Sequence, residues 1–362
     1  MFSIRRQMMQ LISLSALNSF RLAGVWVALL AARGFTMVEI GVAEGVFHIA
    51  SLLFEIPSGV ISDVFGRKYS LVCSRLMGMI SSLLMVVSKG LPGVCTALVF
   101  AAFSYNFESG AREALAYDSL KEHGKEAEYL RYSAADMAIY RVGGASASLL
   151  AGLSLLLGYK TANLVDAALD FICLLIALQL REVRIEPVLR EESAARRILS
   201  CVRESVGFLL AQGQARRIML ANAFAGAISI LLSFFLQARL PQAGLEAAYL
   251  GPALFIMGLG GAMGTRFALR AAKLRYRRLY ALCLSGILLG LFMGVSRTPI
   301  VMILGGFMAA AMDDLLQVRT DSLLNDRFPS SQRATLVSVA SLCFSLVMIV
   351  MSPLAGWLFD AL

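Results

Sequence analysis

The stretch Gly59-Val-Ile-Ser-Asp63-Val-Phe-Gly66-Arg67-Lys68 decides how this chain folds. It joins the end of one apolar run, residues 40–62, to the start of another, residues 69–88. A membrane-spanning helix needs roughly 20 mostly apolar residues, and both runs meet that length. Glycine permits a sharp turn between two helices, and basic residues gather in cytoplasmic loops. The stretch therefore predicts a short cytoplasmic turn between two membrane spans.

The composition of the whole chain agrees with a membrane protein. Its 362 residues are 58% hydrophobic and 16% charged, whereas soluble proteins carry about 25% charged residues. A single soluble core stops growing near 250–300 residues, so lipid is the expected solvent. We predict an all-α membrane protein with eleven spans, at about residues 8–32, 40–62, 69–88, 92–113, 134–157, 161–180, 217–238, 247–267, 279–295, 299–318 and 334–359.

The basic residues indicate the orientation of the chain in the membrane. With the N-terminus inside, 23 of the 33 Lys and Arg fall in cytoplasmic segments and 5 fall outside. This bias is the positive-inside pattern. It also accounts for the net charge of +9 without a nucleic acid partner. We expect a multi-pass protein of a bacterial-type cytoplasmic membrane with its N-terminus in the cytoplasm.

Short repeated sequences divide the chain into two halves. Residues Asp118-Ser119-Leu120 match Asp321-Ser322-Leu323, and Ala151-Gly152 matches Ala355-Gly356. These matches predict an N-terminal six-helix bundle (1–180), a cytoplasmic linker (181–216) and a C-terminal bundle of five helices (217–362). A twelfth helix would complete the second half, so we expect either a truncated chain or a protein of eleven helices. Within the linker, Ile198, Val202, Val206 and Leu209 share one face, which fits a helix on the membrane surface or a solvated linker helix.

The G-x-x-x-D-x-x-G-R-K pattern of residues 59–68 resembles the loop between helices two and three of the major facilitator superfamily. The resemblance implies that family's two-bundle fold, here with about 11 helices (6+5) and the twelfth absent. It implies that Asp63 faces the N-terminus of helix eleven near Arg333, and that this cluster locks the cytoplasmic side. Residues 107–120 are similar to a segment of bacterial family members generally labelled as drug or uncharacterised exporters.

Local chemistry suggests what each residue of this loop does. Gly59 allows a neighbouring helix to approach, and Gly66 permits the turn. The guanidinium of Arg67 can pair with an acid at the inner end of span four, where Glu113 and Asp118 are candidates. A loop that only fixes topology is the alternative. The predicted gating residues are Gly59, Asp63, Gly66, Arg67, Lys68, Glu113 and Asp118.

Ionisable residues inside the spans are candidates for a substrate or proton cavity, because charges are costly in lipid. Glu55, Glu108 and Asp313 are the predicted carriers of a coupling proton. Structural pairing, such as Glu108 with Arg112 or Arg141, is the alternative. Glu44 and His48 fall in the outer half of span two, where packing is an equally simple explanation. The predicted cavity residues are Arg21, Glu55, Glu108, Arg112, Arg141, Asp170 and Asp313.

These features favour a secondary transporter that exports amphipathic small molecules in exchange for protons. A sugar or metabolite uniporter or importer is the first alternative, and a receptor or scaffold without transport is the second. An enzyme is not expected, because the chain has no HExxH, Walker or GxSxG pattern. The six cysteines form no CxxC pair, so we expect no disulfide, metal or cofactor. The expected partners are a small-molecule substrate, a coupling ion such as the proton, and the bilayer, with the protein a monomer.

Overall fold

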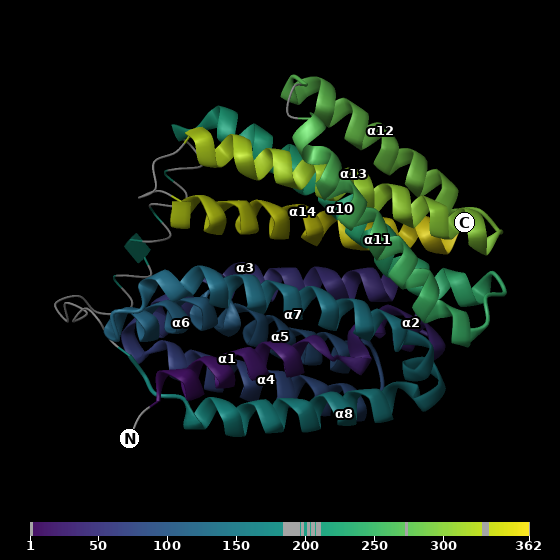
Figure 1. The fold of residues 1–362 in the computed structure, drawn as a ribbon. Coiled ribbons are helices and arrows are strands. Elements are labelled where there is room, and N and C mark those ends of the chain that lie inside the picture. Colours follow the sequence, from purple (N-terminus) through teal and green to yellow (C-terminus); the bar gives the residue numbers. More distant parts are fainter. Residues whose placement is uncertain are drawn as a thin grey trace. The chain divides into compact units, whose positions relative to one another are not determined.

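The computed structural model describes residues 3–183, 211–271, 274–327 and 333–361, together with Arg196, Leu199, Ser200, Arg203 and Gly207. Over these residues the chain is helical and contains no strand, which confirms the all-α prediction (Figure 1). The elements are α1 (Ile4–Ser19), η1 (Leu22–Val25), α2 (Trp26–Ala32), α3 (Met37–Phe65), α4 (Arg67–Val87), α5 (Leu91–Glu108), α6 (Ala111–Glu122), η2 (Glu126–Glu128), α7 (Tyr129–Leu149), α8 (Ala151–Gln179), α10 (Gly213–Gln242), α11 (Ala247–Ala271), α12 (Tyr276–Gly294), α13 (Pro299–Arg327) and α14 (Arg333–Ala361). The predicted amphipathic face at Ile198, Val202, Val206 and Leu209 lies outside the described residues.

Each predicted span coincides with a helix or with consecutive helices. Among the described residues, nine helical segments are long and apolar enough to cross a membrane. The fourth and fifth predicted spans, α5 and α7, are not among these nine. Each carries acids, Glu108 at the end of α5 and Asp136 within α7. Both acids bind arginines of the protein (below), which is how charges are tolerated in a bundle interior.

Glycines with positive φ mark two helix boundaries, one that the apolar pattern placed differently and one that lies between two predicted spans. Gly110 has a φ of 72° and separates α5 from α6, so the predicted span 92–113 ends early. Gly158, with a φ of 78° and a ψ of 162°, interrupts α8. Positive φ is the region that favours glycine. The predicted span 134–157 is therefore made of α7 and the first part of α8.

The start of α3 is fixed by side chains that bind its first backbone amides. Thr36 and Glu39 cap it reciprocally: the Thr36 amide donates to Glu39 Oε2 at 2.9 Å, and the Glu39 amide donates to Thr36 Oγ1 at 3.2 Å. This is the capping-box arrangement that satisfies donors left open at a helix start. It lets α3 begin at Met37, directly after the turn that closes α2.

The chain forms two compact units, each described here by itself. Unit one comprises Met1–Gly24, Ala50–Ala147 and Leu157–Arg203, and unit two comprises Val25–Ile49, Ser148–Leu156 and Glu204–Leu362. These units cut across α3 and α8, whereas the predicted bundles at 1–180 and 217–362 follow the sequence repeat. The bundle boundaries therefore stay a prediction.

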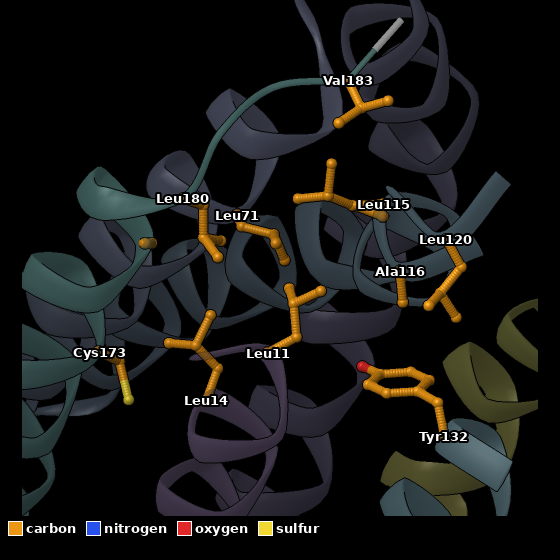
Figure 2. Packing of buried hydrophobic residues seen from close by; sticks show 12 residues of the cluster. Leu11, Leu14, Leu71, Leu115, Ala116, Leu120, Tyr132, Cys173, Leu180 and Val183 are labelled. Atoms are coloured by element: carbon orange, nitrogen blue, oxygen red, sulfur yellow. The ribbon is translucent and has the colours of Figure 1, made fainter. Parts of the chain in front are cut away.

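Unit one has an apolar core where α1, α4, α6 and α8 meet (Figure 2). Leu11, Leu71 and Leu115 are at most 1% exposed, and Figure 2 shows their side chains directed toward one another. Burying a leucine side chain contributes about 1.5–3 kcal/mol relative to water. This core holds α1 and α8 beside the end of α4 that carries the 59–68 motif.

Unit two brings α11 and α13 together through glycines. A Cβ atom on Gly264 would lie 2.8 Å from the carbonyl carbon of Ala311 and 3.0 Å from its Cα. Gly260 meets Phe307 of the same helix in the same way, at 2.8 and 3.0 Å. Small residues are what allow membrane helices to approach this closely.

This packing predicts that Gly264→Val lowers the melting temperature of the purified protein. The added methyl groups would press on the α13 backbone, and overpacking typically costs about 1–3 kcal/mol. Gly258→Val is the matched control on α11, because a Cβ there would meet no described atom within 4 Å. Equal melting temperatures for the two variants would contradict the close packing of α11 on α13.

Candidate functional site

A cluster of paired charges lies buried in unit one, with Arg75 of α4 at its centre. This arginine is 1% exposed. Its Nη2 forms an ion pair with Glu108, its Nη1 donates to Asn18 Oδ1 at 2.7 Å, and Asp170 Oδ1 lies 3.7 Å away. A buried charge is tolerated only when partners satisfy it. The guanidinium thus ties α4 to α1, α5 and α8.

Arg21 binds the same acid of α8 from the other side. Its two terminal nitrogens each donate to one oxygen of Asp170 at 2.6 Å, and its Nη2 also donates to Asn18 at 2.7 Å. A two-pronged contact of this kind is the strongest geometry between arginine and a carboxylate. Asp170 is fully buried, whereas the Arg21 side chain keeps 25% of its surface accessible. Arg21 is therefore the more accessible member of this pair.

The first membrane-spanning segment is interrupted at this cluster. Helix α1 ends at Ser19 and η1 begins at Leu22. The amides of Leu22 and Ala23 donate to the two oxygens of Asp166 at 2.9 and 3.1 Å. Asp166 satisfies the donors that the break would otherwise leave open. Discontinuous helices of this kind build substrate and ion sites in transporters.

Arg112 extends the cluster toward α6 and α7. Its guanidinium donates to Glu108 at 3.2 Å, Glu113 at 3.1 Å and Asp136 at 3.2 Å. Glu108 therefore joins Arg75 to Arg112. Three arginines and five carboxylates, including Asp166, form this set, so it carries a formal charge of −2 when all are ionised.

The structure brings together four of the seven predicted cavity residues: Arg21, Glu108, Arg112 and Asp170. The alternative of a Glu108–Arg112 pair is present. Arg141 is exposed on α7 and is not a partner of Glu108 in any ion pair described, so that suggested pairing is wrong. The central role of Arg75 was not predicted. Its position as the single charged residue between 69 and 88 could have indicated it.

Glu55 and Asp313, the other predicted proton carriers, lie outside this cluster. Glu55 is half-buried on α3. Asp313 is half-buried on α13 in unit two, where the Ser229 hydroxyl of α10 forms a hydrogen bond with its carboxyl group. Of the described residues, no basic side chain forms an ion pair with Asp313.

The 59–68 motif forms a tight corner between α3 and α4. Gly66 has a φ of 117°, and a Cβ on it would lie 2.6 Å from the carboxyl carbon of Glu182. That carboxylate accepts the amides of Arg67 at 3.1 Å and Lys68 at 2.7 Å, at the start of α4. A carboxylate at a helix N-terminus satisfies open donors and the positive end of the dipole. Glu182 lies outside the 59–68 motif, so the motif did not predict this contact.

The Arg67 side chain pairs with Asp118 of α6 and donates to the Ala114 carbonyl at 3.1 Å. Of the two acids suggested by sequence, Asp118 is the partner, because Glu113 binds Arg112. A Cβ on Gly59 would meet no described atom within 4 Å, so the close helix approach expected at Gly59 is not observed. Asp63 is exposed near the end of α3, and its part in gating stays a prediction.

Comparisons with known proteins identify a matching family and several similar proteins. A family model of the Major Facilitator Superfamily matches residues 9–275. The chain is 22% identical over 324 residues to YxaM of Bacillus subtilis (strain 168), an uncharacterised transporter of that type, covering 88% of this chain and 79% of the relative. It resembles the solved structure of the nucleoside transporter NupG with a TM-score of 0.73 at 17% identity, over 98% of this chain and 91% of that one. It resembles a D-xylose-proton symporter with a TM-score of 0.67 at 12% identity, over 99% and 94%. At such identities the likeness to the solved structures shows the fold alone.

The buried cluster predicts that Arg75→Met destabilises the folded protein by about 3–5 kcal/mol, because removing one partner leaves a buried charge uncompensated. Thermal unfolding in detergent measures this. The double variant Arg75→Met/Glu108→Gln should recover part of the loss, since it also removes the acid that Arg75 balances. Arg141→Met is the control, as an exposed arginine of α7 whose loss should change stability by about 0.5 kcal/mol or less. Equal losses for Arg75→Met and Arg141→Met would contradict the cluster.

Proposed function

The chain belongs to the major facilitator superfamily, and from this premise we propose that it is a secondary active transporter that exports amphipathic small molecules in exchange for protons. Transport by alternating access follows from the architecture of such repeat-built transporters, in which two helical halves move about a central site. The observation that carries the proposal is the broken first helix, with Arg21 and its buried partners beside it. We place the N-terminus in the cytoplasm, on the strength of the distribution of basic residues.

The buried cluster supports a binding site rather than simple packing. Ionisable side chains inside a membrane bundle mark substrate and ion pathways, because their desolvation is costly unless they serve a site. Arg21 is partly accessible while its partner Asp170 is fully buried. A polar group of a substrate could therefore meet the guanidinium without displacing Asp170.

The three acids predicted to carry the coupling proton differ in the partners that they contact. Glu108 already binds Arg75, Arg112 and Asn18. Asp313 has a hydroxyl partner, Ser229, and a second acid, Asp314, beside it in sequence. A buried carboxylate with no cation is costly, and binding a proton removes that charge. We therefore assign the coupling proton to Asp313 in preference to Glu108, with Glu55 as the further candidate.

A flux experiment tests the proposal. A panel of amphipathic cations, nucleosides and sugars is screened for compounds that raise the melting temperature, since a ligand that binds the folded state stabilises it. Vesicles containing the purified protein should then move the best compound against its gradient when a pH gradient is applied. Movement down the gradient alone would favour a uniporter, and binding of no compound together with no flux would favour a receptor or scaffold.

The same vesicles test the role of Asp313. Asp313→Asn should abolish accumulation driven by the pH gradient while preserving exchange of labelled for unlabelled substrate, because substrate binding does not need the proton site. Asp326→Asn, an exposed acid at the end of the same helix, is the control and should behave as the wild type. If Asp313→Asn accumulates substrate as the wild type does under a pH gradient, Asp313 does not carry the coupling proton.

The gating role of the 59–68 motif is tested separately. Asp63→Asn should lower transport about tenfold or more, because contacts that set a two-state equilibrium are typically worth 1–3 kcal/mol. The melting temperature should stay near that of the wild type, since Asp63 is exposed. Glu126→Gln, in the exposed cytoplasmic turn after α6, serves as the control. Full transport activity of Asp63→Asn would leave the motif with a purely topological role.

A further inference from the structure

A strongly basic surface lies in unit two, where α11 ends and α12 begins. The sequence has no acidic residue between Glu246 and Asp313. Within this stretch, five arginines stand close to the junction of the two helices and have exposed side chains: Arg266, Arg270, Arg275, Arg277 and Arg278. These five residues are called the α11–α12 arginine patch below. Neither the transport proposal nor the 59–68 motif makes use of them.

The helix ends that carry the patch are held by side chains that point inward. Leu279, in the first turn of α12, is fully buried, and the Tyr276 hydroxyl lies 2.9 Å from Thr320 Oγ1 of α13. On α11, the guanidinium of Arg270 lies over the ring of Phe267, 5.5 Å from its centroid. The start of α12 is thus fixed against α13 while its arginines remain exposed.

Acids of the protein do not neutralise this patch. In unit one, by contrast, basic side chains outside the buried cluster are paired with acids: Arg67 with Asp118, Lys125 with Glu128 and Arg181 with Glu122. Over the part of the chain that the structure describes, no carboxylate forms an ion pair with an arginine of the patch. An anion from outside the protein is therefore needed to balance these charges.

The arginines also occupy positions that are unfavourable for the helices themselves. Arg266 and Arg270 are one turn apart on α11, and like charges at that spacing destabilise a helix. Arg275, Arg277 and Arg278 lie at the start of α12, where the helix dipole is positive and the first turn contains no acid. Helix stability does not explain these residues, whereas an anionic partner would offset both costs.

The depth of the patch in the membrane selects the kind of partner. Candidate membrane spans end at Ala268 on α11 and begin at Tyr276 on α12, so each arginine lies within two residues of a span end. This is the level of the phospholipid headgroups. Phe267 and Leu274, next to the arginines in sequence, are 43% and 42% exposed. Apolar side chains of this kind enter the boundary between headgroups and acyl chains, which favours a lipid over a soluble acidic protein.

We propose that the α11–α12 arginine patch binds anionic phospholipids through their headgroup phosphates, with Phe267 and Leu274 against the upper part of the acyl chains. Arginine suits this role because its guanidinium offers two parallel donors to phosphate oxygens. A zwitterionic headgroup carries an ammonium group that the patch repels, so the surface selects lipids by net charge. In the orientation proposed above, these lipids belong to the cytoplasmic leaflet. The inference does not depend on transport.

Native mass spectrometry of the purified full chain tests this selection with phosphatidylglycerol and phosphatidylcholine. The wild type should bind phosphatidylglycerol more tightly. The triple variant Arg275→Gln/Arg277→Gln/Arg278→Gln should lower that affinity about tenfold or more, because each basic residue near an anionic lipid surface contributes about fivefold. Its affinity for phosphatidylcholine should stay near that of the wild type.

A matched control removes the same number of positive charges elsewhere. Lys121→Gln/Lys125→Gln/Arg131→Gln changes three exposed residues of unit one, in a segment that also contains Glu122 and Glu128. This control should keep the preference of the wild type for phosphatidylglycerol. All variants are first checked for a cooperative melting transition.

Photo-crosslinking locates the bound lipid without any change of charge. A photoreactive amino acid is placed at Leu274 or, as the control, at Phe292, which is 78% exposed. Phe292 lies about 25 Å along α12 from the patch, toward the other membrane surface. In vesicles with equal amounts of the two lipids, position 274 should capture a higher ratio of phosphatidylglycerol to phosphatidylcholine than position 292.

The inference is overturned if the wild type binds the two lipids equally, or if positions 274 and 292 capture the same lipid ratio. Equal losses in the two triple variants would also overturn it, because net charge alone would then explain the binding. Wild-type affinity in the patch variant would leave the arginines free for an acidic protein instead. Failure of the proposed function has a different signature: lipid selection at the patch without substrate flux would leave the lipid site standing and remove transport.

Discussion

The need to pair charges that are buried away from water organises unit one. Arg75 is almost fully buried, and its guanidinium must be satisfied by Glu108, Asn18 and the more distant Asp170. These partners come from α5, α1 and α8, so one side chain fixes the positions of four helices at the same depth. Leaving out any partner would expose a charge to an environment that cannot solvate it. The cluster is thus both a structural tie and the strongest candidate for a site.

Carboxylates at helix starts form a second, recurring device. Asp166 accepts two amides at the break after α1, Glu182 accepts two at the start of α4, and Asp360 accepts two at the start of α3. Each acid comes from a helix or segment distant in sequence, so each contact fixes one helix end against another. Helix N-termini carry partial positive charge and unsatisfied N–H donors, which makes such contacts favourable.

The sequence allowed the helical spans and the corner at Gly66 to be predicted, because both depend on local chemistry. Runs of apolar residues define the helices, and a glycine with positive φ defines the turn. The pairings were harder to predict, since they depend on which helices meet. Arg75 was overlooked because an arginine in an apolar run shows no partner in the sequence. Glu182 was overlooked because it lies 115 residues from Arg67, whose amide it accepts.

The ionisable groups in the membrane fall into two kinds, and the difference bears on mechanism. Arg21, Arg75 and Arg112 hold their acids in direct ion pairs. Asp313 contacts a hydroxyl, and Glu44 contacts a histidine. Only groups of this second kind can change charge without leaving an arginine unpaired. In the mechanism that we propose, the coupling proton is therefore assigned to Asp313 and substrate recognition to the fixed charges around Arg21.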